Sequence, residues 1–180
     1  MLQQLSQKIL KWCGWSITDT CSLPDRCVIC IAPHTSNWDF VWGMLYKWAT
    51  HLHISFFMKK EWFRFPMGGL MRRLGGIPVN RSRKTSLTDA MAMEFSRHEH
   101  FCVGITPEGT RKPNADWKKG FYFIALKAEV PIVIAKIDYA TRQVGCVATF
   151  TPTGDVEADL RQIKAYYRNV TAKKPNNFLC

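Results

Sequence analysis

The sequence is poor in acidic residues and contains no long apolar run. Its 180 residues include 14 Asp and Glu against 25 Lys and Arg, a formal net charge of +11. Every stretch free of these charged residues is shorter than the ~18 residues that a membrane-spanning helix requires. No repeat, low-complexity segment or linker divides the chain. With 47% hydrophobic residues, the chain is neither disordered nor fibrous. We expect one globular domain, soluble or peripheral to a membrane.

The chain also lacks a signal peptide and a paired cysteine framework. Its first residues after Met1 contain neither a basic start nor an apolar core. The seven cysteines are an odd number, and several lie in apolar runs, where free cysteine behaves as a small hydrophobe. This predicts free thiols in a reducing compartment. The spacing of Cys27 and Cys30 is compatible with a redox or zinc motif, but no second pair exists and a strand would place them on opposite faces. Two strand residues are the favoured interpretation.

The basic surplus is concentrated between Lys59 and Lys84, where eight basic residues accompany a single acid, Glu61. Aromatic side chains are interleaved with these cations. This mixture is typical of a segment in a membrane interface, of a groove for single-stranded nucleic acid, or of a solvated basic face over core aromatics. Composition leaves the three open. The candidate interface residues are Lys59, Lys60, Trp62, Phe63, Arg64, Phe65, Arg72 and Arg73.

The N-terminus predicts a short amphipathic helix. Leu2, Leu5, Ile9 and Trp12 recur at helical spacing, with lysines beside them. The stripe fits either an interfacial helix or a helix packed on the protein's own core. We divide the chain into an interfacial helix, residues 1–20, and a main domain, residues 21–180.

The remaining chain alternates short apolar runs with amphipathic ones, which predicts a single α/β domain with a mostly parallel or mixed sheet flanked by helices. Pro131 opens one strand, at a position that cannot donate a ladder bond. The expected strands are Cys27–Ala32, Ile54–Met58, Ile77–Val79, Phe101–Ile105, Val130–Ile137 and Val144–Phe150. The expected helices are Trp38–Thr50, with Ser36 or Asn37 as N-cap, Ser86–His98, Trp117–Ala128 and a last helix along Val156, Leu160, Ile163 and Tyr167.

The segment after the first buried strand carries a candidate general base. His34 follows the strand, and Asp39 lies in the first turn of the next helix. A carboxylate bonded to one imidazole nitrogen fixes the tautomer and leaves the other nitrogen as a base. The helix N-terminus disfavours imidazolium. A His with an Asp five residues later is common, and Asp39 also suits the helix dipole.

Two further turns carry arginines that suit an anion. The first begins at Gly75-Gly76 and runs through a short strand to Arg81. The second, Thr106–Lys112, directly follows a strand; Gly109 permits close backbone approach, and Arg111 offers a planar fork suited to phosphate. Each turn alone is also compatible with ordinary solvated charge.

In this order the three segments resemble the glycerolipid acyltransferases, the family of 1-acylglycerol-3-phosphate (lysophosphatidic acid) acyltransferase. His34 and Asp39 match its His-x4-Asp motif, the glycine turn through Arg81 its second motif, and Pro107–Arg111 its Pro-Glu-Gly-Thr-Arg-like box. Val130–Val133 resembles a fourth motif. Asn80 departs from the family, in which Asp commonly precedes the arginine, and the departure bears on the choice of acceptor.

The resemblance implies the family's fold and acyl transfer from acyl-CoA or acyl-carrier protein to the hydroxyl of a lysophospholipid. His34 would be the general base and Asp39 would orient it. The acceptor would be held by Arg81, Glu108, Gly109, Thr110 and Arg111. No protein nucleophile is needed, and no Gly-x-Ser-x-Gly elbow is present. No cofactor or metal is expected; the pairs His51/His53 and His98/His100 lack Asp or Cys partners and suggest surface residues.

The resemblance also makes the membrane interpretation of the basic aromatic segment the favoured one, because substrate and product are anionic lipids. The implied partners are an anionic membrane surface, the lysophospholipid, the acyl thioester and acyl-carrier protein, with no nucleic acid. The implied location is the cytoplasm, at the inner face of the membrane. The alternatives are an acyltransferase for another lysolipid, such as lyso-ornithine lipid, and a non-catalytic membrane-binding module.

Overall fold

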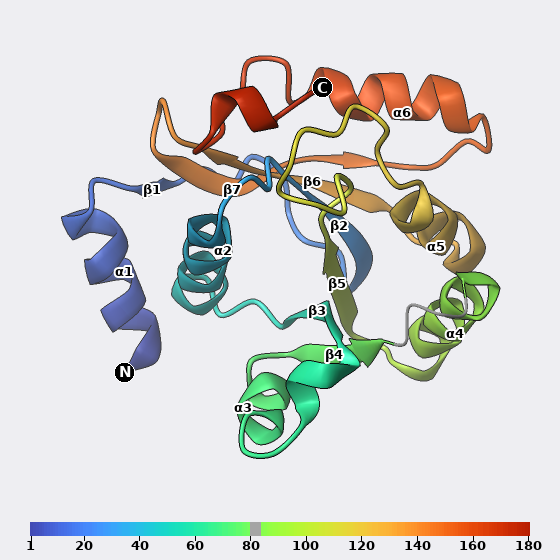
Figure 1. The fold of residues 1–180 in the computed structure, drawn as a ribbon, viewed down its shortest axis with the longest axis horizontal. Helices are drawn as coiled ribbons and strands as arrows, with labels where there is room; N and C mark the ends of the chain where they lie inside the picture. The colour runs from blue at the N-terminus through green and yellow to red at the C-terminus, as the bar shows by residue number, and fades with distance from the viewer. Residues whose placement is uncertain (80–83) are drawn as a thin grey trace.

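The computed structural model describes residues 1–79 and 84–180, with the side chains of 59, 79 and 84–87 left out. Its centre is a seven-stranded mixed sheet in the order β1-β7-β6-β2-β5-β3-β4 (Figure 1). The strands are β1 (Ser16–Ile17), β2 (Arg26–Ala32), β3 (Ile54–Lys59), β4 (Gly76–Val79), β5 (Phe101–Ile105), β6 (Ile132–Asp138) and β7 (Gln143–Phe150). This confirms the predicted α/β fold.

The central strands are parallel and buried. β2 pairs in parallel with both β5 and β6, and the only antiparallel pair among the described strands joins β6 to β7. Continuous apolar sequence is what a strand covered on both faces requires. The residues that follow β2, β5 and β6 therefore meet at one edge of the sheet.

Helices cover both faces. They are α1 (Leu2–Trp12), α2 (Asn37–Ala49), α3 (Gly68–Arg73), α4 (Lys84–Arg97), α5 (Gly120–Ala128) and α6 (Val156–Ala165), with 3₁₀ turns η1 (Lys60–Phe63) and η2 (Pro175–Asn177). One core cluster joins the sheet to α4, α5 and α6, and a second joins it to α1 and α2. Cys27 lies in the second cluster and Cys30 in the first, so the opposite-face prediction is confirmed. Both thiols are free.

Two elements begin later in the chain than predicted. The helix expected from Trp117 begins at Gly120, because Trp117 packs as a core residue of the preceding loop. The strand expected from Val130 begins at Ile132, after Pro131, whose carbonyl accepts from the Val28 amide at 3.1 Å. The short elements β1, η1 and α3 were not predicted, since none carries a periodic apolar pattern long enough to recognise.

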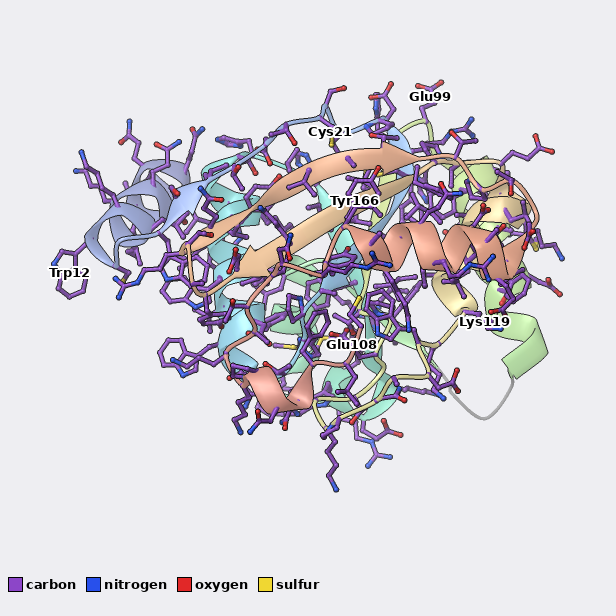
Figure 2. The ribbon with its side chains drawn as sticks, turned by 90° about the horizontal axis from the view of Figure 1, so that it is seen from above. Trp12, Cys21, Glu99, Glu108, Lys119 and Tyr166 are labelled. Carbon is purple, nitrogen blue, oxygen red and sulfur yellow. The ribbon has the colours of Figure 1, made fainter. Side chains whose placement is uncertain are left out.

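The N-terminal helix forms as predicted, and its apolar stripe is mostly exposed, with Ile9 alone packed on the core. Ser6 and Leu10 are the buried residues of α1, whereas Leu2, Leu5 and Trp12 are exposed, Trp12 at 87%. Figure 2 shows Trp12 pointing away from the body of the protein. Packing of the whole stripe on the core is therefore wrong. The boundary at residue 20 stays a prediction, but β1 already pairs with β7.

None of the helices in the described part of the chain has the length and apolarity needed to cross a bilayer.

Candidate active site

His34 and Asp39 are brought together by the turn between β2 and α2. Ser36 is the N-cap of α2, and its side chain accepts from the Trp38 amide at 3.2 Å. The Asp39 carboxylate closes a capping box, since its Oδ2 accepts from the amides of Ser36 at 2.7 Å and Thr35 at 2.6 Å. The chain thereby folds back, and His34 Nδ1 lies 3.8 Å from the same oxygen.

The imidazole of His34 is held neutral. Its side chain is 25% exposed, and that of Asp39 is 2% exposed. Burial lowers the pKa of His34 below its usual value; the Asp39 charge opposes this and the Arg111 charge adds to it. With Nδ1 turned toward the carboxylate, Nε2 is the nitrogen left to accept a proton. The separation of 3.8 Å is longer than a hydrogen bond, as is common for catalytic pairs without substrate.

Tyr139 is a part of the site that the sequence interpretation missed. It follows β6, the parallel neighbour of β2, and its hydroxyl donates to Asp39 Oδ1 at 2.6 Å. Burial and this carboxylate raise the pKa of the phenol, so it remains a donor. Asp39 thus accepts on both oxygens and cannot rotate freely. One feature of the sequence could have pointed to Tyr139: it lies at the end of an apolar strand, where the functional residues of parallel sheets are found.

Glu108 lies inside the protein, shortly after the end of β5 and in contact with the turn that carries His34. Its side chain is 2% exposed, and Figure 2 places it in the interior. Oε1 accepts from the His34 amide at 2.7 Å, while the buried Oε2 has no hydrogen-bond partner among the described residues. Burial raises the pKa of Glu108 to about 7. The contact seen here fastens the His34 main chain; a direct contact with substrate stays a prediction.

The loop after Glu108 carries exposed cations. Gly109 has a φ of 65°, and a Cβ there would meet the Lys118 side chain at 3.0 Å. The Thr110 hydroxyl accepts from the Lys112 amide at 3.2 Å. Arg111 is exposed, and its charge acts on His34. The Gly109–Arg111 group and the His–Asp pair therefore share one edge of the sheet.

The second arginine expected at the site, Arg81, lies outside the described residues, as does Asn80. The glycine turn before them is described. Gly75 has a φ of 94°, and the Lys47 ammonium donates to the carbonyls of Leu74 at 2.8 Å and Ile54 at 2.6 Å. β4 then runs parallel to β3.

The candidate interface residues run from the end of β3 through η1 and the turn after it to α3, next to β4 (Figure 1). Phe65 is 98% exposed, Trp62 is 54% exposed, and the Arg72 guanidinium lies 5.6 Å from the centre of the half-buried Phe63 ring. Lys60, Arg64 and Arg73 are exposed; the Lys59 side chain is outside the description. We call the exposed residues from Lys60 to Arg73 the basic aromatic surface.

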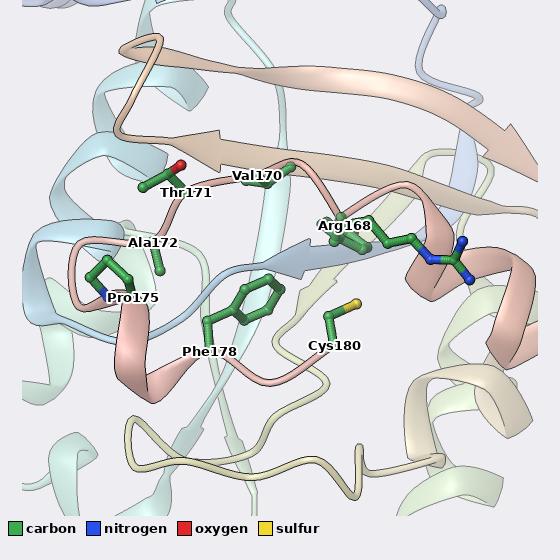
Figure 3. Close-up of a pocket in the computed structure, with 8 residues that line it drawn as sticks. Arg168, Val170, Thr171, Ala172, Pro175, Phe178 and Cys180 are labelled. Atoms are coloured by element: carbon green, nitrogen blue, oxygen red, sulfur yellow. The ribbon is translucent and has the colours of Figure 1, made fainter.

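Neither the described histidine pairs nor the cavity near the C-terminus adds to this site. His98 pairs with Glu94, His100 pairs with Asp25, and no group of three metal-ligating side chains occurs among the described residues. A cavity of about 320 Å³ lies beneath the segment that follows α6 (Figure 3). None of the site residues named above lines it.

An α/β sheet with a His–Asp pair and a cationic loop at the carboxyl ends of its central strands defines an enzyme-like site for an anionic substrate. The Acyltransferase family model matches residues 16–137, most of the chain. The chain therefore belongs to the Acyltransferase family, as its motifs predicted.

Relatives agree with this membership. The human 1-acyl-sn-glycerol-3-phosphate acyltransferase beta is 42% identical over 71 residues, which cover 36% of this chain and 26% of that protein. The match thus spans about a quarter of the relative. The crystal structure of the 1-acyl-sn-glycerophosphate (LPA) acyltransferase PlsC from Thermotoga maritima superposes with a TM-score of 0.59 at 19% identity, covering 95% of this chain and 80% of that one. This likeness concerns the fold.

Proposed function

We propose that this chain transfers an acyl group from acyl-CoA or acyl-carrier protein to the free hydroxyl of 1-acylglycerol-3-phosphate, which yields phosphatidic acid. The observation that carries the proposal is the His34 imidazole beside the buried Asp39 carboxylate, both of whose oxygens accept hydrogen bonds. The family membership supplies the reaction type, and the name of the human relative supplies the acceptor.

In the proposed reaction His34 Nε2 removes the proton from the acceptor hydroxyl while its oxygen attacks the thioester carbonyl. The tetrahedral intermediate collapses as the carbon–sulfur bond breaks, and the imidazolium returns the proton to the leaving thiolate. An ester and a free thiol result. General base catalysis of this kind contributes about 10²–10⁴-fold in rate. Asp39 orients the ring and stabilises the imidazolium.

The acceptor phosphate is assigned to the arginines. Arg111 is exposed at the mouth and electrostatically coupled to His34, which is the arrangement required when a phosphate lies a few atoms from the reacting hydroxyl. A guanidinium binds phosphate in a bidentate geometry. We assign Arg81, Gly109 and Thr110 to the same group, with Glu108 fastening the His34 main chain beneath it.

The proposed partner of the basic aromatic surface is an anionic membrane. Exposed rings beside unshielded cations suit the headgroup region, where the rings enter the interface and the cations meet anionic lipid. The exposed stripe of α1 would add a second contact. We propose the inner face of the membrane, on the cytoplasmic side, because that leaflet carries the anionic lipids.

The experiment that tests the proposal measures radiolabelled acyl transfer from acyl-CoA and from acyl-carrier protein to a panel of lysolipids. We expect phosphatidic acid from the wild type, and none above background from the His34→Ala variant. The matched control is His53→Ala, which removes an exposed histidine outside the site.

Transfer only to another lysolipid, such as lyso-ornithine lipid, would retain the mechanism and change the acceptor. A folded protein that binds vesicles but is silent on every acceptor would overturn the enzymatic proposal in favour of a membrane-binding module.

A further inference from the structure

The segment after α6, residues 171–180, returns to the edge of the sheet that carries the site (Figure 3). We call it the return segment. It lies beyond the residues 16–137 that the family model matches. At its start the Tyr139 amide donates to the Thr171 carbonyl at 2.9 Å. The segment is therefore attached to the residue that holds Asp39.

Two further hydrogen bonds fasten the return segment to both catalytic loops. The Lys174 amide donates to the Thr35 hydroxyl at 3.2 Å, next to His34. The Asn177 side chain donates to the Arg111 carbonyl at 2.9 Å. Neither bond uses a lysine side chain, so the course of the segment does not depend on the charges it carries.

The segment brings two cations to this place. The Lys173 ammonium lies 5.5 Å from the centre of the Tyr139 ring, and Tyr139 donates to Asp39. Lys173 and Lys174 are both exposed, as is Arg111. Among the described residues, none of the three forms an ion pair with a carboxylate. The carboxylates of the site are buried beneath them.

We propose that Lys173 and Lys174 extend Arg111 into a cationic rim that binds a phosphate group of a substrate. The inference rests on the proposed function and deepens it, since both substrates carry phosphate: the acceptor as a phosphomonoester, acyl-CoA in its nucleotide and acyl-carrier protein in its prosthetic arm. Lysine ammonium groups bind phosphate as mobile point charges, which suits the open edge of a site beside a fixed arginine.

The test compares four proteins: the wild type, Lys173→Gln with Lys174→Gln, the Arg pair Lys173→Arg with Lys174→Arg, and a control, Lys119→Gln with Lys127→Gln. The control removes the same charge from α5, where both lysines form exposed ion pairs. The acceptors are lysophosphatidic acid and monoacylglycerol, which lacks phosphate. The donors are acyl-CoA and acyl-N-acetylcysteamine, which also lacks phosphate.

We expect the Gln pair to raise one KM by about tenfold with kcat retained, and the Arg pair to restore it. A rise confined to lysophosphatidic acid assigns the rim to the acceptor, and one confined to acyl-CoA assigns it to the donor. Unchanged KM values would overturn the proposal that the rim binds phosphate. A fall in kcat alone would also overturn it and would make the two lysines positioning residues.

Equilibrium dialysis with labelled short-chain lysophosphatidic acid and with CoA separates this inference from the proposed function. If the wild type binds either ligand without turning it over and the Gln pair binds it at least fivefold more weakly, the rim stands while the reaction fails. Binding of neither ligand, or equal binding by both proteins, would overturn the rim.

Discussion

The carboxylates and the cations of this site are held in opposite ways. Asp39 is 3% exposed and Glu108 is 2% exposed, and each accepts hydrogen bonds from the main chain around His34. Arg111, Lys173 and Lys174 are exposed and meet no carboxylate among the described residues. The inner groups hold the base in one geometry, while the outer groups remain free to meet an anion.

This difference assigns different effects to mutations in the two regions. Removing a buried hydrogen-bond acceptor leaves its donors unsatisfied and displaces the His34 nitrogen. Substitutions of Asp39 or Glu108 should therefore affect kcat and stability. An exposed cation contributes chiefly through its charge in solvent, so changes there affect KM, pH dependence or membrane affinity.

The largest effect is expected for Asp39→Asn. The amide cannot accept from Tyr139 and from the two turn amides at once, and it no longer stabilises imidazolium, so kcat should fall about a thousandfold. Asp159→Asn is the matched control, since Asp159 is equally buried and accepts from Tyr122 and Thr153 beneath α6. Both variants should lose stability in urea, but only the first should lose activity. Equal kcat values would contradict the assignment.

The next effect concerns Glu108→Gln and appears in stability against pH. Burial raises the pKa of Glu108 from 4.5 to about 7, so the folded state holds this proton more tightly than the unfolded state. The group's contribution is fully present below pH 4.5 and is lost as pH rises through 7, a change of about 3 kcal/mol. The free energy of unfolding of Glu108→Gln, measured in urea, should therefore rise relative to that of the wild type between pH 4 and pH 8. That of the exposed control Glu99→Gln should not. A flat difference would contradict this.

A smaller effect is expected on the basic aromatic surface. Neutralising Arg72 and Arg73 to Gln should weaken binding to anionic vesicles by about tenfold or more, since each cation near such a surface contributes about 1 kcal/mol. The free energy of unfolding should hardly change, because both side chains are exposed. Lys119→Gln with Lys127→Gln serves as control in a sedimentation assay. Equal vesicle binding by the two double variants would remove the membrane assignment.

The smallest effect is a shift in the pH profile of Arg111→Gln. The Arg111 charge helps to lower the pKa of His34, and a base must be unprotonated to act, so activity is lost as pH falls through that pKa. Without Arg111 the acid limb of kcat/KM should therefore move to higher pH, by a small amount because Arg111 is exposed to solvent. Lys112→Gln, an equal change of charge one residue away, should leave the limb in place. Identical shifts would show a general charge effect.

Much of this arrangement could be predicted from local sequence. Apolar runs marked the buried strands, and Ser36 with Asp39 marked both the start of α2 and the partner of His34. Arg111 was found because its turn, Thr106–Lys112, directly follows a strand. Glu108 was expected at the substrate because the resemblance implies it, and this stays a prediction; its burial against the His34 main chain was not predicted, since glutamate is seldom fully buried.

Other features needed the folded chain. Tyr139 is 100 residues from Asp39, and no local pattern relates them; they meet because β2 and β6 are parallel neighbours. The outward direction of the α1 stripe depends on which face α2 covers. In the sequence, Lys173 and Lys174 are indistinguishable from ordinary surface charge. Only the folded chain shows that the return segment brings them next to Thr35 and Tyr139.

Periodicity, capping and three short motifs thus determined the fold class, the candidate base and the family, because each depends on residues close together in the chain. The tertiary structure alone decided which groups surround that base. Parallel strands align their carboxyl ends whatever their separation in sequence, and burial, which no short segment controls, sets the pKa values of His34 and Glu108.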